Sequence, residues 1–344
     1  MKKRILYLGG SITCGASASD YERSWAWLSF NGFARAIYGD DVEMLNASIS
    51  GTGSRVAVFR LHDQVLPYHP DMVLVEFAVN DNEVSKCDRE MVIASMEYLV
   101  RTLKAQNPDV AITFVYTTNR DGENASHAHT VVAQHYGIPE IDLRAAVLDK
   151  IRTGENTWED FLADAAHPVD AGHRLYADVV TRTILSAPAR FTAPVRERDP
   201  IASCAFRAPR MLIPDVNEAD GFTIGEANDN SPYKRLPTLF VQKAAITERV
   251  GATLNFSFEG NHFGVYARIG GNGGRVRVEI DGVDYGTIEG YHRYGEGTEI
   301  GGEYISRFYV RTLTDGAHRA TLTTLPPHPD SAGSTVCLAA FLVD

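Results

Sequence analysis

Ile5-Leu6-Tyr7-Leu8-Gly9-Gly10-Ser11-Ile12-Thr13 is the stretch that decides the fold. Its apolar first half is typical of a buried parallel strand, and two glycines end that strand just before a serine. Open α/β sheets bind their ligands at the carboxyl ends of the strands. Ser11 is therefore a candidate nucleophile whose own N–H lies near a developing oxyanion, or else a turn serine that caps the next helix.

Expected strands and helices alternate through the first half of the chain. The later strands are expected at 42–45, 72–79, 110–116 and 138–142, and the helices at 25–38, 55–65, 89–106, 128–136, 143–152 and 171–185. Such alternation predicts an α/β fold with a doubly wound parallel sheet.

The second half of the chain has a different pattern. Residues 186–200 hold three prolines and little periodicity, which is typical of a linker. From 201 onward, short alternating runs are separated by turns such as Gly270-Gly271-Asn272-Gly273-Gly274 and Asp281-Gly282. We therefore expect a catalytic domain over 1–187, a linker over 188–200, and a β-sandwich or jelly-roll domain over 201–344.

Composition limits the choice of partner and compartment. The chain has 344 residues, a net charge of -11 and a pI near 5.5, which argues against nucleic acid or an anionic membrane as the main partner. A small-molecule or saccharide substrate fits better, and the oligomeric state stays open, a homo-oligomer included. The four cysteines are scattered and form no metal or disulfide motif; they are Cys14, Cys87, Cys204 and Cys337. The apolar run after the basic start ends at Gly9, too early for a signal peptide, and no stretch has the length of a membrane span, so we expect a cytoplasmic protein.

A second polar cluster lies far along the chain, at Asp164-Ala165-Ala166-His167-Pro168. An aspartate three residues before a histidine can turn its carboxylate onto one ring nitrogen, which leaves the other nitrogen free to take a proton from a serine. Asp170 is a suitable N-cap for the helix that follows. Taken alone, Asp164 also fits a loop cap and His167 a surface histidine.

Gly51 and Asn80 follow the second and third expected strands. Carboxyl ends of adjacent parallel strands meet at one edge of a sheet, so we expect both residues to lie near Ser11. The N–H groups of Ser11 and Gly51 and the side-chain amide of Asn80 would then form an oxyanion hole. Each residue alone also fits an ordinary loop glycine or turn asparagine.

These residues stand in motifs that resemble those of the SGNH, or GDSL-like, hydrolase superfamily, whose markers are Ser, Gly, Asn and His. The matching blocks are Gly9-Gly10-Ser11-Ile12-Thr13, Ser50-Gly51-Thr52, Ala78-Val79-Asn80-Asp81, and Asp164-x-x-His167-Pro168 continued by Gly172-His173. The resemblance covers about the first 185 residues and implies a flavodoxin-like sheet and a Ser-His-Asp esterase or thioesterase without metal or cofactor. The sequence departs from the pattern at Gly10, where the family usually has an acid, and at Ala78, where it usually has glycine.

The second half is similar to jelly-roll domains that accompany some sugar-ester-cleaving members, such as carbohydrate esterase family two. The similarity rests on Gly264-Val265-Tyr266, Val278-Glu279-Ile280-Asp281-Gly282 and Asp315-Gly316-Ala317-His318, although in that family the jelly roll precedes the hydrolase. Aromatic residues at Tyr291-His292-Arg293-Tyr294 and Tyr304 fit either stacking on sugar rings or ordinary sheet packing.

Other polar and aromatic residues have simpler interpretations. His127 and His129, with Asp121 and Glu123 nearby, suggest a metal cluster, but a solvated helix face is the preferred interpretation.

Residues close to the serine turn and in the third strand also have structural interpretations. Trp25 and Trp27 fit packing on the sheet or the wall of an acyl pocket, and Cys14 fits a packed small residue. Glu76 lies within an apolar strand and must find a hydrogen-bond partner, which we expect in a neighbouring loop.

The sequence thus predicts a serine esterase with Ser11 as nucleophile, His167 as base and Asp164 as its orienting partner. An acetyl group on a carbohydrate is the hypothesis for the substrate. A lipid or acyl-thioester hydrolase and an acyltransferase are the enzymatic alternatives. A saccharide-binding module on a hydrolase scaffold is the alternative outside the enzymes.

Overall fold

The computed structural model describes residues 2–83, 88–201, 206–227, 242–292 and 303–344. The described residues up to Phe206 form one compact unit, and those from Arg207 form a second. Among the described residues, no helix combines the length and the apolar character needed to cross a membrane.

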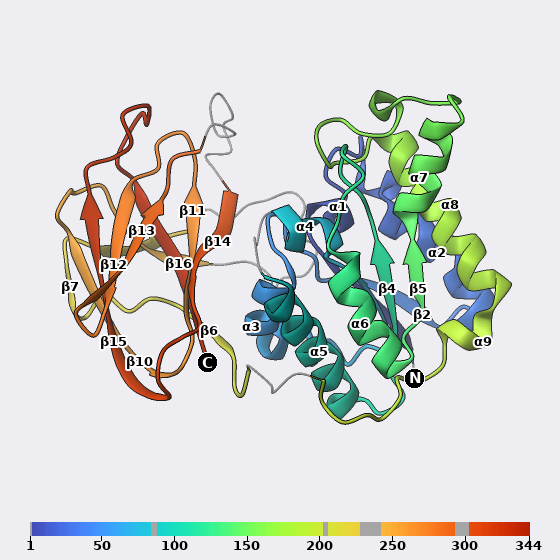
Figure 1. Cartoon of the computed structure of the whole chain (residues 1–344), viewed down its shortest axis with the longest axis horizontal. Coiled ribbons are helices and arrows are strands. Elements are labelled where there is room, and N and C mark those ends of the chain that lie inside the picture. Colours follow the sequence, from blue (N-terminus) through green and yellow to red (C-terminus); the bar gives the residue numbers. More distant parts are fainter. Residues whose placement is uncertain (1, 84–87, 202–205, 228–241, 293–302) are drawn as a thin grey trace. The chain divides into compact units, whose positions relative to one another are not determined.

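The first unit is built on a five-stranded parallel sheet (Figure 1). Its strands are β1 (Lys3–Gly9), β2 (Val42–Asn46), β3 (Met72–Glu76), β4 (Ala111–Tyr116) and β5 (Glu140–Asp142). They lie in the order β2-β1-β3-β4-β5, which is the flavodoxin-like order. The chain reverses its direction of travel between β1 and β3, so the ligand crevice of such a sheet is expected where β1 ends.

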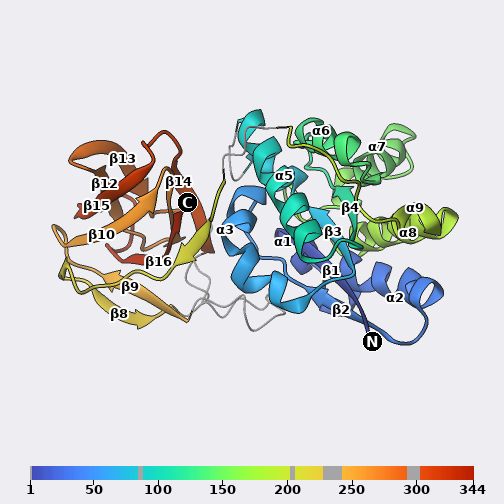
Figure 2. The same cartoon turned by 90° about the horizontal axis from the view of Figure 1, so that it is seen from below.

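Helices cover both faces of this sheet (Figure 2). They are α1 (Ser11–Cys14), α2 (Trp25–Tyr38), α3 (Ser54–Gln64), α4 (Ala78–Glu83), α5 (Arg89–Gln106), α6 (Ser126–Tyr136), α7 (Leu143–Arg152), α8 (Asp170–Ser186) and α9 (Pro188–Phe191), with 3-10 turns at Tyr21–Arg23, Leu66–Tyr68 and Trp158–Asp160. Apolar side chains of α2, α7 and α8 share one core with Ile5, Tyr7 and Leu74 of the sheet. Helices α3, α5 and α6 pack side by side on the other face.

Helix α2 shows how the sequence sets these elements. The Ser24 side chain accepts a hydrogen bond from the Trp27 N–H at 3.3 Å and caps the first turn. Gly39, with φ of 75°, ends the helix where a positive φ is needed. The buried Trp25 ring meets Tyr7 of β1 edge-on at 5.3 Å, so this tryptophan packs on the sheet. The helix predicted over 25–38 is confirmed.

The third strand is shorter than predicted. β3 ends at Glu76, and Ala78 and Val79, expected in the strand, begin the short helix α4 instead. The Asp81 N–H donates to the Phe77 carbonyl at 2.8 Å, which closes the first turn of that helix. The prediction was wrong here because a buried helical turn can be as apolar as a buried strand.

The segment expected as a linker, 188–200, lies against the first unit. Lys104 Nζ donates to the Val195 carbonyl at 2.8 Å, and the Arg196 N–H donates to the Tyr136 carbonyl at 3.1 Å. Farther on, the Phe206 ring packs on Phe59 at a centroid distance of 5.7 Å. These contacts extend the first unit to Phe206.

The second unit consists of two antiparallel sheets. Its strands are β6 (Arg210–Leu212), β7 (Ala219–Asp220), β8 (Thr223–Glu226), β9 (Lys243–Thr247), β10 (Thr253–Gly260), β11 (Phe263–Ile269), β12 (Arg275–Ile280), β13 (Val283–Glu289), β14 (Glu303–Val310), β15 (Gly316–Leu325) and β16 (Val336–Val343). One sheet has the order β13-β12-β15-β10-β7 and the other β14-β11-β16-β9-β8, with β6 added beside β16. Buried residues of both sheets, such as Leu322 and Phe341, form one core, so the unit is a β-sandwich.

The turn predicted at Asp281-Gly282 is confirmed. Both residues have positive φ, 52° and 78°, as a tight two-residue hairpin requires, and they join β12 to β13.

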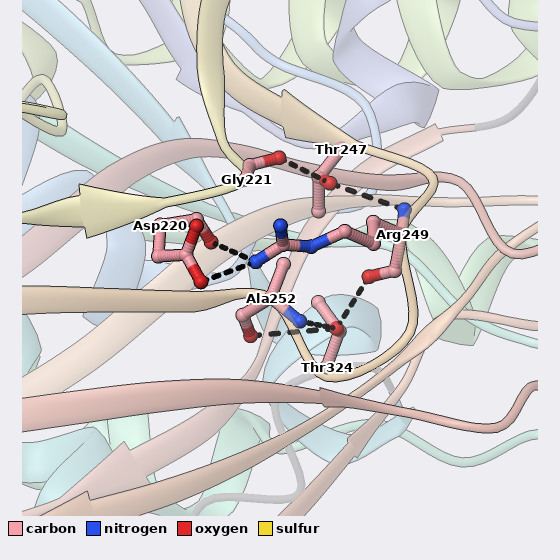
Figure 3. A network of polar contacts seen from close by, with 6 residues as sticks. All are labelled: Asp220, Gly221, Thr247, Arg249, Ala252 and Thr324. Carbon is pink, nitrogen blue, oxygen red and sulfur yellow. Dashed lines mark hydrogen bonds and ion pairs between the residues drawn. The ribbon is translucent and has the colours of Figure 1, made fainter.

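A polar network at one corner of the sandwich connects strands of both sheets (Figure 3). The Arg249 guanidinium donates to the Asp220 carboxylate, and the Thr324 hydroxyl donates to the Arg249 carbonyl at 2.7 Å. The Thr247 hydroxyl accepts from the Arg249 N–H and donates to the Gly221 carbonyl. The network lies outside the apolar core and fixes the corner between the two sheets.

Candidate active site

Ser11 lies where the fold places ligands. It follows β1 as the first residue of α1, and Gly10 is the N-cap in an extended conformation. The first N–H groups of a helix have no acceptor within the helix, so the Ser11 N–H is available to a ligand. A side chain on Gly9 would come within 2.7 Å of the Glu76 carbonyl, so glycine lets β1 run into this turn.

A hydrogen-bonded line of three side chains leads away from Ser11. Ser11 Oγ lies 2.7 Å from His167 Nε2, and His167 Nδ1 lies 2.7 Å from Asp164 Oδ2. The other carboxylate oxygen of Asp164 accepts from the N–H groups of Ala166 and His167 at 2.9 and 2.8 Å. The geometry therefore orients His167 with Nδ1–H toward Asp164 and the Nε2 lone pair toward the serine hydroxyl.

Asp164 is ionised in this arrangement. Partial burial opposes the charge, but the hydrogen bonds from the His167 ring and from two backbone N–H groups lower the pKa of the Asp164 carboxyl well below its usual range. A carboxylate that stays charged at neutral pH can stabilise an imidazolium when His167 takes a proton.

The loop that carries Asp164 and His167 is closed on itself. Leu162 and Pro168 form an antiparallel bridge, and the Ala163 N–H donates to the His167 carbonyl at 2.8 Å. Helix α8 follows closely, because a side chain on Gly172 would come within 2.3 Å of the Phe161 carbonyl. Glycine at 172 therefore fixes the distance between α8 and this loop.

Asp170 has a different role from the predicted N-cap. Its carboxylate accepts hydrogen bonds from the N–H and hydroxyl of Ser19 at 2.8 and 2.7 Å and pairs with Arg23. Helix α8 begins at Asp170 itself, with Val169 as its N-cap. Asp170 thus holds the loop that follows the serine turn instead of capping its own helix.

His173 is a second tie between α8 and that loop. Nδ1 accepts from the Trp25 N–H at 3.2 Å, and Nε2 donates to the Ala16 carbonyl at 3.1 Å. Burial lowers the pKa of His173 to about 4, so this histidine is neutral at neutral pH. Both ring nitrogens are used in these hydrogen bonds, so His173 has a structural role next to the Ser11 turn.

The loop with Gly51 is fastened to the end of β1. The Ala47 N–H donates to the Tyr7 carbonyl at 2.8 Å and the Ile49 N–H to the Gly9 carbonyl at 3.1 Å. Gly51 itself has φ of 69°, a conformation that favours glycine. The sheet therefore places Gly51 in the loop beside the serine turn.

Asn80 lies in α4 with its side-chain amide next to the serine turn. A Cβ on Gly10 would come within 2.1 Å of Asn80 Oδ1, which shows how closely the amide lies over this glycine. The Asn80 side chain is buried, and Oδ1 has no hydrogen-bond partner among the described residues. The missing acid at position 10 thus has a physical reason, since glycine leaves room for the Asn80 amide in this conformation.

Comparison with known proteins identifies the family of the first unit. Residues 7–175 match the sequence model of the GDSL-like Lipase/Acylhydrolase family. The first unit belongs to this GDSL-like family. An arylesterase from Vibrio mimicus is 22% identical over 187 residues, which are 53% of this chain and 88% of that protein. The family assignment makes the chain an ester hydrolase at the level of reaction class.

The two-unit architecture also has a counterpart among solved structures. A two-domain esterase active on acetylated mannans, solved with and without mannopentaose, superposes with a TM-score of 0.81 at 21% identity. The match covers 99% of this chain and 90% or 91% of that one. The GDSL-like unit and the following β-sandwich therefore share their fold with this esterase.

Glu76 is buried beneath the GDSL-like serine turn and is fully hydrogen-bonded. Its two carboxyl oxygens accept from Thr13 Oγ1 and Thr117 Oγ1, each at 2.7 Å. Burial raises the pKa of Glu76, and the two threonine hydroxyls only partly oppose this rise. Its role is the structural one that the sequence predicted, because it ties α1 to the loop after β4.

Sequence reasoning missed the partner of His129 in the GDSL-like unit. His127 is exposed as predicted, but the prediction of a solvated face was wrong for His129, which is buried with Nε2 at 2.8 Å from Asp81 Oδ2. A signal was present, since Val132 and Ala133 stand three and four residues after His129 and place it on the apolar face of α6.

Some of the aromatic residues and cysteines singled out in the sequence lie in the described part of the chain, and others do not. In the β-sandwich, Tyr291 stacks on His328 with a centroid distance of 4.9 Å. Arg293, Tyr294 and the side chain of Tyr304 lie outside the described residues, as do Cys87 and Cys204. In the GDSL-like unit Cys14 is buried, as predicted for a packed small residue.

Proposed function

We propose that Ser11, His167 and Asp164 are the catalytic triad of a serine esterase that removes acetyl groups from carbohydrate. The observation that carries the proposal is the continuous line from Ser11 Oγ through both nitrogens of His167 to Asp164, with 2.7 Å at each step. Residues 156 positions apart meet in the relative orientation that proton transfer needs.

In the first half of the reaction, Ser11 Oγ attacks the ester carbonyl while His167 Nε2 takes the hydroxyl proton. Asp164 stabilises the imidazolium through Nδ1–H. The N–H groups of Ser11 and Gly51 and the Asn80 side-chain amide donate hydrogen bonds to the oxyanion of the tetrahedral intermediate. His167 then passes its proton to the leaving alcohol, and an acetyl-serine ester remains.

In the second half, water attacks the acetyl-serine. His167 takes a proton from this water, the same donors stabilise the second oxyanion, and the proton returns to Ser11 Oγ as acetate leaves. Ser11, His167 and Asp164 thus supply the nucleophile, the proton-transfer group and its orienting partner that these steps need.

The substrate class is supported by the similarity to the two-domain esterase, which acts on acetylated mannans and shares both units with this chain. A net charge of -11 favours a neutral saccharide ester over nucleic acid or an anionic membrane as the partner.

Hydrolysis of 4-nitrophenyl acetate and 4-nitrophenyl octanoate by the wild type, Ser11→Ala and Ser257→Ala tests the proposal. Ser257 is an exposed serine of β10 in the second unit and serves as the control. We expect Ser11→Ala to lose at least about 10³-fold in kcat, Ser257→Ala to lose none, and the wild type to prefer acetate. Activity in Ser11→Ala equal to that of the wild type would overturn the triad.

Substrate preference separates the alternatives. A preference for octanoate would overturn the acetyl assignment and favour a lipid or thioester hydrolase. Transfer of acetyl to a sugar in preference to water would show an acyltransferase. Release of acetate from acetylated mannan oligosaccharides, followed by mass spectrometry, is the expected result.

A further inference from the structure

Asp81 connects the elements that carry two of the three oxyanion donors of the proposed reaction, helix α4 with Asn80 and the loop with Gly51. Asp81 directly follows Asn80 in α4. Its Oδ1 accepts a hydrogen bond from the Ser54 N–H at 2.8 Å. Ser54 is the first residue of α3, three positions after Gly51. The Asp81 carboxylate therefore connects α4, which carries Asn80, to the start of α3, which follows the Gly51 loop.

The Asp81 contact replaces a missing helix cap. The N-cap of α3 is Gly53, which has no side chain to accept from the first N–H groups. Asp81 supplies that acceptor from another helix, and a carboxylate at a helix N-terminus is also favoured by the helix dipole. The start of α3, and with it the Gly51 loop, is thus anchored to α4 instead of being capped locally.

His129 holds the Asp81 carboxylate in place. His129 Nε2 lies 2.8 Å from Asp81 Oδ2, and neither side chain is exposed to solvent. The ring lies between Phe114 and Tyr116 of β4, at centroid distances of 6.2 and 5.9 Å. With one oxygen on Ser54 and the other on His129, the carboxylate has a fixed orientation.

His129 carries a proton on Nε2, because this nitrogen faces the Asp81 carboxylate at 2.8 Å. Nδ1 is buried and has no hydrogen-bond partner among the described residues. A proton on Nδ1 would be an unsatisfied buried donor, whereas a bare ring nitrogen costs less. Nε2–H therefore donates to Asp81 Oδ2.

We propose that Asp81, oriented by His129, is a positioning residue that sets the spacing between the Gly51 N–H and the Asn80 amide. The inference rests on the proposed function, because it assigns a role within the oxyanion hole of that reaction. Asp81 touches neither the substrate nor the reacting atoms and acts through helix α4 and the Gly51 loop, which it connects.

Variants of His129 test the orientation of Asp81. His129→Phe keeps an aromatic ring, somewhat larger than imidazole, but leaves Asp81 Oδ2 without its donor, and His129→Gln provides an N–H in place of Nε2–H. Oxyanion donors act in the transition state, so displacing them lowers kcat and leaves KM nearly unchanged. We expect a loss of about 10-fold to 100-fold in kcat for His129→Phe and a substantial recovery in His129→Gln.

Variants of Ser54 test the same link from its other end. Ser54→Pro removes the N–H that Asp81 accepts, at the first helical position, where proline is well tolerated. Ser54→Ala keeps this N–H and removes only the hydroxyl. We expect Ser54→Pro to lose kcat in the same range as His129→Phe, and Ser54→Ala to stay near the wild type.

Rates are divided by the concentration of active sites, titrated with a serine-reactive phosphonate, so that misfolded protein does not count. A fall in kcat per site at constant KM in His129→Phe and Ser54→Pro, with recovery in His129→Gln, supports the inference. Wild-type kcat per site in either disruptive variant overturns it. Failure of the proposed function is distinguishable, since the wild type would then show no activity that depends on Ser11.

Discussion

Each unit of this protein contains a histidine whose Nδ1 faces an aspartate. In the first unit, His167 Nδ1 lies 2.7 Å from Asp164; in the second, His318 Nδ1 lies 2.6 Å from Asp281. The two pairs differ in the neighbour of the other ring nitrogen. His167 Nε2 faces the Ser11 hydroxyl at 2.7 Å, whereas His318 Nε2 faces the Thr314 carbonyl at 2.7 Å.

This neighbour decides what a His–Asp pair can do. A hydroxyl can give its proton to Nε2, so His167 can act as a base. A carbonyl can only accept, so His318 donates from both nitrogens and closes a turn between strands. A histidine beside an aspartate is therefore no sign of catalysis until the second nitrogen is known.

Removal of the two imidazoles gives the largest expected contrast. We expect His167→Ala to lower kcat for 4-nitrophenyl acetate at least about 10³-fold, because it removes the base. His318→Ala should leave kcat per active site near the wild-type value. Steady-state kinetics with active-site titration measures both, and a comparable loss in the folded His318→Ala variant would contradict the distinction.

Gly172→Ala displaces the first pair without changing its residues. The new Cβ would meet the Phe161 carbonyl, so the loop with His167 must move. A shift of about 1 Å in a catalytic group can cost about 10²-fold, and we expect a loss of kcat of this size. Gly32→Ala in α2 is the control, because the three atoms nearest to its Cβ all belong to the Thr181 side chain of α8. Equal losses in the two variants would show that helix packing, and not the position of His167, is responsible.

The pH dependence of stability sharpens the comparison through His173. Its folded pKa of about 4 lies below the usual value of 6.5, so the unfolded state binds more protons between these pH values. The contribution of neutral His173 to the free energy of unfolding is complete above pH 6.5 and is lost as pH falls toward 4. The loss amounts to about 3 kcal/mol. His173→Gln should flatten this acid limb in urea unfolding followed by tryptophan fluorescence. All three tryptophans, Trp25, Trp27 and Trp158, lie in the first unit, and an unchanged limb would refute the assignment.

The second unit should respond to pH in the opposite sense at His318. Burial opposes its charge, but Asp281 and the Thr314 carbonyl outweigh burial and raise the pKa of His318. Its stabilisation is therefore complete below pH 6.5 and is lost as pH rises through the higher folded value. His318→Gln should destabilise the sandwich more at pH 5.5 than at pH 8.5, because the favoured charged form of His318 is lost in the variant. Hydrogen exchange of the β15 amides measures this difference, and a larger effect at pH 8.5 would contradict it.

The sequence allowed prediction of elements whose ends are marked by local chemistry. Helix α2 has a serine cap and a terminal glycine, and strands β11, β12 and β16 alternate or are apolar throughout, so their bounds follow from the residues. β7 and β8 are short and largely exposed, which leaves no alternation to detect. β3 was predicted too long because Ala78 and Val79 are apolar in a helix as well.

The site was predictable to the extent that its chemistry is carried by motifs. Ser11, Asp164 and His167 come from two short stretches whose spacing indicates their roles, and the structure brings their side chains together. The Asp81–His129 contact joins residues 48 positions apart, and no local pattern specifies such a pairing. Asp170 was misassigned for the same reason, since its partner Ser19 lies 151 positions away.

The described residues after α9, 192–201 and Phe206, determine where the chain can be cut. Phe206 packs on Phe59 and Tyr98, each at 5.7 Å, and Lys104 holds the Val195 carbonyl. A fragment that ends at residue 187 would expose this aromatic cluster and leave Lys104 without that acceptor. A recombinant esterase domain intended for crystallisation or engineering should therefore extend at least through Phe206.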